Sequence, residues 1–354
     1  MAWLPPGEMP LVHAGQTLRL CLRQCLEVRP GEWFEVAVGC RNEFGLWKRD
    51  EFPFPAPVAL ELVLLSLRGE LLAAPETRGS LLLTSSGKLE FSARMEAPAE
   101  PAMLCVRASD VDLIRPLVPV LSPPMGPGEL PHPKRLTLEQ CRLISVGASS
   151  LLCAECQGDL GIGGRLWDGG LVLLEYLATG KLERRRVLEL GSGVGLVGLG
   201  CALLGAKVWL TDLEEVIPLL EFNIALNRAR GLTLDVEAKA HEWGTDVAEL
   251  PAVDLVVMAD LVYDVEASKQ LLASLVALAK AEVEFLMAFR PRNVEDPEFF
   301  RELSTHFEVQ RLEERGVYGK TCYDLEILRL GARKGMAQAE CAALQRDSAH
   351  ASKS

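Results

Sequence analysis

The chain has 354 residues, a hydrophobic fraction of 49% and a formal net charge of −12. This length favours about two domains, and the apolar content is enough for a buried core. An acidic chain without basic patches is not expected to bind nucleic acid. The first residues lack the basic start of a secretory signal, and the longest uncharged apolar stretch, 194–206, is too short to cross a membrane.

Ten cysteines are scattered through segments that are typical of strands and helices. Such a distribution favours reduced thiols, which indicates the cytoplasm or the nucleus. The pair Cys153 and Cys156 has the spacing of two metal ligands, but no second pair follows at a suitable distance. We therefore expect no metal site, and the oligomeric state stays open.

Alternation of apolar and polar residues marks the first part of the chain as β. The pattern predicts about seven short strands, near residues 18–22, 34–38, 58–64, 81–84, 89–93, 103–108 and 118–121. The turn residues Ser86 and Gly87 predict a hairpin between the fourth and the fifth of these strands. Short strands separated by turns are typical of a sandwich of immunoglobulin-like kind. We therefore expect an all-β sandwich-like domain over residues 1–121, followed by a Pro/Gly linker at 122–134.

Strands and helices alternate in the second part of the chain, over residues 135–333. Apolar runs predict strands that start near residues 187, 208, 235, 253 and 283. Helical spacing predicts helices at 170–180, 195–205, 214–230, 266–280 and 295–305. Two further runs, 307–312 and 324–330, predict a closing antiparallel hairpin. This alternation is typical of an α/β fold, and residues 334–354 are expected to form a tail with a short helix at 336–345.

Three glycines follow the first strand of this second part, in the run Val187-Leu-Glu-Leu-Gly-Ser-Gly-Val-Gly195. Glycine allows the backbone to approach a ligand closely and to take positive φ. Asp212 ends the next strand and can accept from both hydroxyls of a ribose. Glycines alone fit both a dinucleotide and S-adenosylmethionine. Glu189 favours the latter, because it can accept from an ammonium and would repel a pyrophosphate.

Aromatic and acidic residues follow the other strands. Trp167 precedes the first helix of the second part, where it either walls the cofactor or packs in the core. Trp243 follows the third strand and can stack on an adenine ring. Asp260 and Tyr263 follow the fourth strand, at the edge where ligands of open α/β sheets bind. We expect Asp260 to meet the reacting group, with capping of the next helix as the alternative.

The ordered set of motifs resembles the seven-β-strand protein-lysine methyltransferases known as methyltransferase family 16. The matching segments are 166–168, 187–193, 210–215, Asn223 and Asn227, 243–244 and 258–263. The resemblance covers residues 135–332. It implies an α/β fold with a Rossmann-like, seven-stranded class I methyltransferase domain behind the β-domain.

The resemblance also implies an activity, namely methyl transfer from S-adenosylmethionine to a lysine of a protein of chaperone, ATPase or translation-factor type. Glu189, by its charge, joins the cofactor site that the resemblance implies, which consists of Trp167, Gly191, Ser192, Gly193, Asp212, Trp243 and Ala259. Asp260 and Tyr263 match the Asp-x-x-Tyr signature and are the catalytic candidates. Two other functions stay open: a catalytically silent binding protein that works through its β-domain, and a small-molecule methyltransferase.

Overall fold

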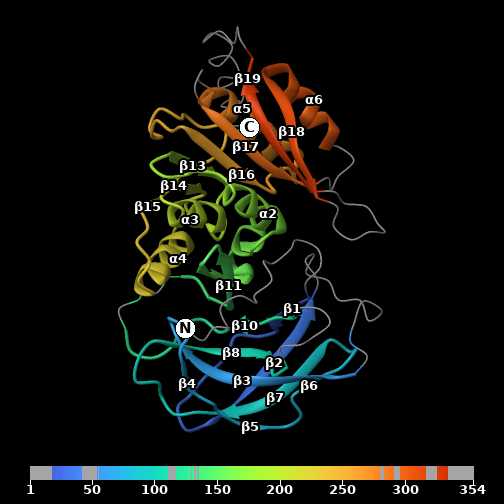
Figure 1. Cartoon of the computed structure of the whole chain (residues 1–354), viewed down its shortest axis with the longest axis vertical. Helices are drawn as coiled ribbons and strands as arrows, with labels where there is room; N and C mark the ends of the chain where they lie inside the picture. Colours follow the sequence, from blue (N-terminus) through green and yellow to red (C-terminus); the bar gives the residue numbers. More distant parts are fainter. Residues whose placement is uncertain are drawn as a thin grey trace. The chain divides into compact units, whose positions relative to one another are not determined.

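The structure is a computed structural model that describes residues 18–41, 54, 56–110, 117–128, 130, 133, 135–279, 283–290, 296–315 and 325–333. The chain divides into two compact units, Met1–Leu166 with Glu221–Leu232 and Trp167–Leu220 with Thr233–Ser354 (Figure 1). The expected tail at 334–354 and its helix lie outside the described residues. In the part that the structure describes, no helix is long and apolar enough to cross a membrane.

Two mostly antiparallel sheets form the first unit. Its elements are β1 (Leu18–Leu22), β2 (Trp33–Arg41), β3 (Val58–Ser66), β4 (Leu71–Ala73), β5 (Glu76–Arg78), β6 (Leu82–Leu83), β7 (Lys88–Arg94), β8 (Ala102–Ala108), β9 (Leu117–Val118), β10 (Val120–Leu121), β11 (Gln140–Val146), β12 (Ser149–Glu155), α1 (Gln157–Leu160) and the 3-10 turn η2 (Gly161–Gly164). One sheet has the order β5-β7-β2-β1-β9, and the other has the order β12-β11-β10-β8-β3-β4 with β6 beside β3. Apolar residues of both sheets share one core, so the first part of the chain is β as predicted.

The strand pairing of this unit corrects two details of the prediction. The predicted hairpin between 81–84 and 89–93 is wrong, because β6 pairs with β3 whereas β7 pairs with β2 and β5. Both edges of β7 are therefore occupied by other strands. Residues 118–121 do not form one strand either. They divide between β9, which pairs with β1, and β10, which pairs with β8.

The second sheet of this unit continues past the predicted linker. β10 pairs with β11 at Leu121 and Cys141, and β11 pairs with β12 along its whole length. The sequence pattern did not predict β11 and β12, since the buried polar residues Arg142 and Glu155 interrupt it. Sheet hydrogen bonding thus joins residues on both sides of the predicted boundary at 134/135. The predicted division into a β-domain at 1–121, a linker at 122–134 and a methyltransferase domain at 135–333 stays a prediction.

Two asparagines of helix α4 (Ile217–Ala229) cover the outer edge of β12. Asn223 accepts from the backbone N–H of Ala154 at 2.8 Å and donates to the carbonyl of the same residue at 3.2 Å. Asn227 makes the same pair of bonds with Leu152, at 2.9 and 2.7 Å. Residues four apart share a helix face, so the two amides together replace the strand that this edge lacks.

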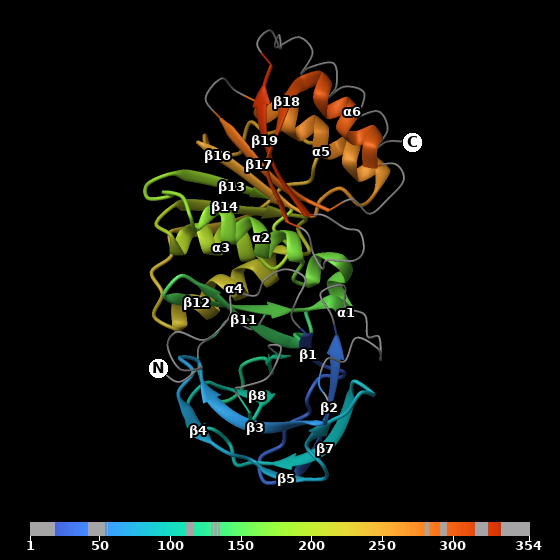
Figure 2. The same cartoon turned by 45° about the vertical axis from the view of Figure 1, so that its right-hand side comes forward.

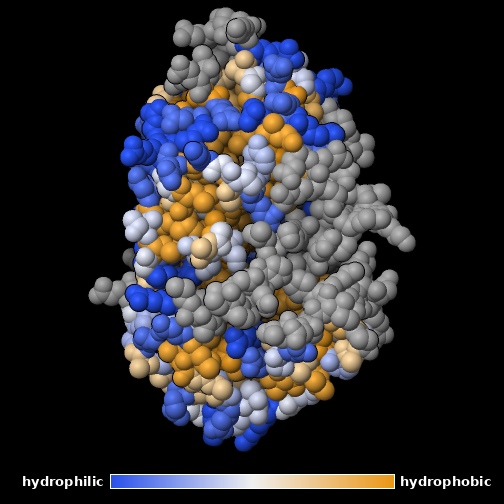
Figure 3. All heavy atoms as spheres, viewed as in Figure 1, coloured by the Kyte–Doolittle hydropathy of each residue, from blue (hydrophilic) through white to orange (hydrophobic). Residues whose placement is uncertain are grey.

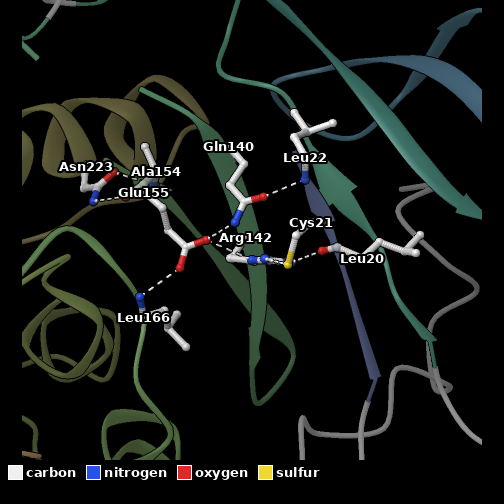
Figure 4. A network of polar contacts seen from close by, with 9 residues as sticks. All are labelled: Leu20, Cys21, Leu22, Gln140, Arg142, Ala154, Glu155, Leu166 and Asn223. Atoms are coloured by element: carbon white, nitrogen blue, oxygen red, sulfur yellow. Dashed lines mark hydrogen bonds and ion pairs between the residues drawn. The ribbon is translucent and has the colours of Figure 1, made fainter. Parts of the chain in front are cut away.

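A buried ion pair connects three strands of the first unit (Figure 4). Nε of Arg142 on β11 donates to Oε2 of Glu155 on β12 at 3.0 Å. The other two nitrogens donate to the carbonyl of Leu20 and to Sγ of Cys21 on β1. Burial alone would raise the pKa of the Glu155 carboxyl, but Arg142 and the hydrogen bonds that the carboxylate accepts lower it. The pair is therefore held ionised inside the unit.

The same carboxylate has two further donors. Nε2 of Gln140 donates to Oε2 of Glu155 at 2.6 Å, while Oε1 of Gln140 accepts from the backbone of Leu22 at 3.0 Å. The other oxygen of Glu155 accepts from the backbone N–H of Leu166 at 2.8 Å. Glu155 thus fixes the last residue of the segment that leads into the second unit.

A seven-stranded sheet forms the second unit. Its elements are α2 (Asp168–Leu177), β13 (Arg186–Leu190), α3 (Leu196–Leu203), β14 (Lys207–Asp212), β15 (Val236–Ala240), β16 (Leu255–Ala259), α5 (Val265–Leu278), β17 (Glu284–Phe289), α6 (Asp296–His306), β18 (Phe307–Arg315) and β19 (Leu325–Ala332). The strand order is β15-β14-β13-β16-β17-β19-β18. The first five strands are parallel, and β19 is antiparallel to β17 and β18. The predicted strands, helices and closing hairpin are confirmed.

Helices cover both faces of this sheet. Val208 and Leu210 on β14 lie against Gly198 of α3, where a Cβ would collide with both side chains. Trp209 between them points to the opposite face and packs into the core formed with Leu271 of α5 and Leu303 of α6. Figure 2 shows α5 and α6 side by side on that face. Because helices cover both faces of the sheet, a ligand site is expected at the carboxyl ends of the parallel strands.

Some large apolar side chains are exposed. In the first unit these include Leu71 and Leu82, on the short strands β4 and β6. In the second unit they are Leu213, Tyr263 and Val265. Figure 3 shows a face on which apolar and hydrophilic residues form mixed patches. Leu213 directly follows β14, Tyr263 lies between the end of β16 and α5, and Val265 is the first residue of α5.

Candidate active site

The predicted site residues come from the ends of parallel strands. β13 is followed by the glycines, β14 ends at Asp212, and β16 ends at Ala259. β14, β13 and β16 are neighbours in the sheet, and β15 lies beside β14. Their carboxyl ends therefore meet at one edge, which is where open α/β sheets bind ligands.

The glycine loop after β13 has a backbone that other residues rarely adopt. Gly191, Gly193 and Gly195 have φ of +59°, +54° and +81°. A Cβ on Gly191 would lie 2.6 Å from Leu261 and 2.8 Å from the ring of Trp243. Glycine is therefore required here, and the structure brings the ring of Trp243 against the loop.

Ser192 fastens this loop to the neighbouring strand. Its backbone N–H donates to the carbonyl of Thr211, and its Oγ accepts from the N–H of Thr211, both at 3.0 Å. The hydroxyl of Thr211 donates to the carbonyl of Glu189 at 2.7 Å. The side chain of Ser192 thus shapes the loop, and its predicted contact with a cofactor stays a prediction.

The carboxylate of Asp212 is fixed by two backbone donors. Oδ2 accepts from Gly193 at 2.7 Å, and Oδ1 accepts from Leu213 at 2.8 Å. Burial raises the pKa of Asp212, although these two bonds oppose the shift. Each carboxylate oxygen can accept more than one hydrogen bond. The carboxylate therefore has a fixed orientation and lone pairs for further donors, and its predicted contact with a ribose stays a prediction.

Glu189 is buried at 3% exposure and faces the start of helix α3. Its Oε2 accepts from the backbone N–H of Gly198 at 2.9 Å. The N-cap residue of this helix, Gly195, has no side chain that could do so. Burial raises the pKa of Glu189 to about 8. In the structure the carboxyl group accepts a hydrogen bond from the first turn of α3. Its expected contact with an ammonium stays a prediction.

Asp260 directly follows β16 in a left-handed conformation, with φ of +57°. Its Oδ2 accepts from the backbone N–H of Gly169 in α2 at 2.6 Å. The alternative role as a cap of the next helix is wrong, because Asp264 caps α5 by accepting from Ala267 at 2.9 Å. The side chain is thus held at the strand-end edge.

Three other predicted residues lie around this edge. Tyr263 is 40% exposed. Partial burial, with the charges of Asp212 and Asp264, raises its pKa, so the phenol keeps its proton at neutral pH. Trp167 is half-buried at the N-cap of α2, and Ala259 is half-buried at the end of β16.

An ion pair at this edge was missed by the sequence analysis. Asp168 in the first turn of α2 lies 3.4 Å from Arg290, and both side chains are almost fully buried. Arg290 comes directly after β17. An arginine at the end of an apolar strand was the available signal, but its partner is too far away in the sequence to be inferred.

His241 is a second residue at this edge that the sequence pattern did not predict. It follows β15, and its backbone N–H donates to the carbonyl of Asp212 at 2.8 Å. Its ring is buried, and Nε2 has no hydrogen-bond partner among the described residues. Burial, with the positive charge of Lys239, lowers its pKa, so the ring is neutral at pH 7. A buried polar atom without a partner is expected to bind something else.

These features fit S-adenosylmethionine. The glycine loop has a left-handed backbone, Asp212 presents acceptors that two backbone N–H groups orient, and the aromatic ring of Trp243 lies against Gly191 of the loop. In the described part of the chain, no group of three or more side chains could hold a metal ion. The strand order and the strand-end residues together define a class I methyltransferase that uses S-adenosylmethionine.

Comparison with known proteins identifies the family. Residues 147–306 match the lysine methyltransferase family. The protein N-lysine methyltransferase METTL21A of Danio rerio is 37% identical over 157 residues, which cover 43% of this chain and 72% of that protein. The protein-lysine N-methyltransferase EFM6 of Saccharomyces cerevisiae is 34% identical over 191 residues, which cover 45% and 76%. The EEF1A lysine methyltransferase 3 of Xenopus tropicalis is 29% identical over 175 residues, which cover 47% and 77%.

The chain belongs to this family of lysine methyltransferases. It is an enzyme that transfers a methyl group from S-adenosylmethionine to a lysine of a protein substrate. The predicted family, fold and activity are thereby confirmed. The family match begins at residue 147, so it contains β12 but not the strands before it.

Proposed function

We propose that this enzyme binds S-adenosylmethionine and its target lysine at the strand-end edge of the second unit. The cofactor side consists of Trp167, Glu189, Gly191, Ser192, Gly193, Asp212, Trp243 and Ala259. The lysine side consists of Asp260 and Tyr263. The observation that carries this assignment is the convergence of the glycine loop, Asp212 and Asp260 on one edge of a parallel sheet.

On the cofactor side, Asp212 accepts from the two ribose hydroxyls with a carboxylate that is already oriented. Because two backbone N–H groups hold it, little freedom is lost on binding. Trp243 offers a ring face to the adenine. Nε2 of His241, buried at the end of the neighbouring strand, is available to a polar edge of the same ligand.

On the lysine side, the incoming amine has to be neutral to attack the methyl group. A free lysine has a pKa of about 10.4, so its deprotonation at pH about 7 costs roughly 4.6 kcal/mol. Desolvation beside Tyr263 removes part of this cost. Asp260 orients the amine by accepting a hydrogen bond from it, and the alignment of nitrogen, methyl and sulfur supplies the rest of the catalysis.

The substrate that we propose is a protein of the translation-factor or chaperone type. Supporting this class, one relative is named for lysine methylation of EEF1A. The net charge of −12 suits a partner that presents a basic lysine segment. We further propose that the enzyme works in the cytoplasm or the nucleus, since the cysteines in the described segments are all free thiols.

Labelled methyl transfer tests this function directly. The full chain is incubated with a cell lysate and S-adenosylmethionine that carries a labelled methyl group, and the labelled band is analysed by mass spectrometry. We expect the label on the side-chain nitrogen of a lysine, and we expect Asp260→Ala to abolish it while cofactor binding persists. Label on a small molecule or on another residue type, or full activity of Asp260→Ala, would contradict the proposal.

A further inference from the structure

Helix α2 starts without a capping side chain from its own segment. Its N-cap residue is Trp167, whose side chain makes no capping hydrogen bond. The backbone N–H of Gly169, in the first turn, instead donates to Oδ2 of Asp260 at 2.6 Å. The carboxylate at the end of β16 therefore supplies one of the acceptors that every helix start needs.

Asp260 is held from two directions. Its backbone N–H donates to the carbonyl of Ala288 on β17 at 3.0 Å, in a left-handed conformation that residues other than glycine rarely adopt. Its side chain is held by the start of α2, where the helix dipole favours a negative charge. The sheet thus fixes the backbone of Asp260, and the helix fixes its carboxylate.

Only a glycine at position 169 permits this contact. A Cβ there would lie 2.7 Å from Cγ of Asp260 and closer still to Oδ2. The neighbouring Gly170 differs, because a Cβ on it would meet only Val197 and Leu196, at 3.5 and 3.7 Å. These are ordinary contacts, so Gly170 tolerates alanine whereas Gly169 does not.

We propose that Gly169 is a positioning residue for methyl transfer. Its missing side chain lets the carboxylate of Asp260 reach the start of α2, and its N–H aims that carboxylate at the incoming amine. A methyl group at position 169 pushes the carboxylate out of place, because the three atoms nearest to it all belong to the side chain of Asp260. This inference rests on the proposed catalytic role of Asp260.

The kinetic test compares Gly169→Ala with the matched control Gly170→Ala. For the wild type and both variants, the rate of label transfer is measured at saturating cofactor into the lysate protein that the wild type labels. Binding of S-adenosylhomocysteine to each protein is measured by calorimetry. We expect Gly169→Ala to lose roughly ten- to hundredfold in rate, with cofactor affinity changed less than about threefold. Gly170→Ala should keep both values near those of the wild type. Equal rates for the two variants would overturn the proposal.

A stability cycle tests the contact itself without any substrate. The melting temperature is measured for Gly169→Ala, Asp260→Ala and the double variant. The added methyl group should lower the melting temperature when Asp260 is present and have almost no effect when position 260 is alanine. An equal drop in both backgrounds, or a Gly169→Ala protein that does not fold even with Ala at 260, would overturn the proposal. Full activity of Asp260→Ala with an intact cycle would refute the catalytic role of Asp260 and, with it, the positioning role of Gly169, while the contact between the two residues would stand. Loss of activity in Asp260→Ala without an intact cycle would refute the inference about Gly169 and leave the proposed function in place.

Discussion

The two seven-stranded sheets of this molecule hold their carboxylates in different ways. In the first unit, Glu155 is buried beside the guanidinium of Arg142, and the pair connects β1, β11 and β12. In the second unit, Glu189, Asp212 and Asp260 are held by backbone N–H groups of loops and helix starts. In the first arrangement a guanidinium compensates the charge of the carboxylate. In the second, backbone N–H groups orient the carboxyl group.

The two arrangements indicate different roles, namely stabilisation of the fold by the first and ligand binding by the second. A carboxylate paired with an arginine has its charge compensated, so it stabilises one arrangement of strands and offers little to a ligand. A carboxyl group held by backbone N–H groups is oriented by them, and its remaining lone pairs stay available to a ligand. Burial raises the pKa of Glu189 and of Asp212 in this setting. Asp168, paired with Arg290, is the second unit's counterpart of Glu155. We therefore expect changes in the first network to alter stability, and changes at the strand ends to alter binding and rate.

The largest expected effect is that of Arg142→Ala. The change leaves Glu155 buried without its cation, which typically costs about 3–5 kcal/mol. Urea unfolding of the full chain measures it. The control is Arg94→Ala, which breaks an exposed 2.7 Å pair with Glu76 and should cost under about 1 kcal/mol. Equal stability of the two variants would show that the buried pair is not what holds these strands.

Asn223→Ala should come second. It removes both bonds to the backbone of Ala154, at the outer edge of β12. Leaving a buried N–H and carbonyl without partners costs about 2 kcal/mol. The exposed Glu221 on the same helix provides the control, since Glu221→Ala should leave the urea midpoint unchanged. A midpoint for Asn223→Ala that equals the control would mean that this edge needs no cover.

Glu189→Gln should change the pH dependence of stability. The pKa of Glu189 is raised to about 8 in the folded protein, so the stability it contributes is full below its usual pKa and is lost as the pH rises through about 8. Glutamine does not titrate. The melting temperature of the wild type should therefore fall by several degrees relative to Glu189→Gln between acidic and alkaline pH. If the melting temperatures of the two proteins changed with pH in parallel, the ionised carboxylate of Glu189 would have to be well solvated in the folded protein, which would contradict the prediction.

The smallest expected effect is that of Ser274→Ala. The hydroxyl of Ser274 on α5 accepts from the backbone N–H of Gly244 at 2.8 Å, directly after Trp243. Its loss should cost about 1 kcal/mol, and the melting temperature should fall by a few degrees. Cofactor affinity should decrease slightly through Trp243. A larger loss of affinity than of stability would reveal that this bond positions the ring.

Local patterns made most of the fold predictable. β2 is visible in the sequence because apolar and polar residues alternate along it. β13 is visible because it is a short run of mostly apolar residues. β11 and β12 were missed, since Arg142 and Glu155 occupy buried positions that the pattern reserves for apolar residues. The two residues compensate each other across the hairpin of β11 and β12, and Arg142 also donates to β1, about 120 residues away in the sequence. Alternation of apolar and polar residues predicts neither contact.

The candidate site was predictable to the same extent. Gly191, Gly193 and Asp212 belong to short motifs whose chemistry follows from their place after a strand. The contact between Asp260 and Gly169 joins residues 91 apart in the sequence, and neither residue signals the other. The alternative role of Asp260 as a helix cap was wrong by four residues, since Asp264 caps α5. Sequence alone does not fix where a helix begins within a few residues.

Calorimetric titration of S-adenosylhomocysteine into the full chain tests whether the strand-end carboxylates bind the cofactor. We expect saturable binding by the wild type, a loss of roughly 1–3 kcal/mol for Asp212→Ala, and wild-type affinity for Arg142→Ala at a temperature where it is folded. Glu214→Ala, an exposed acid two residues further on, is the matched control. Absence of binding, or equal affinity of Asp212→Ala and Glu214→Ala, would contradict the assignment of the strand-end carboxylates to the cofactor.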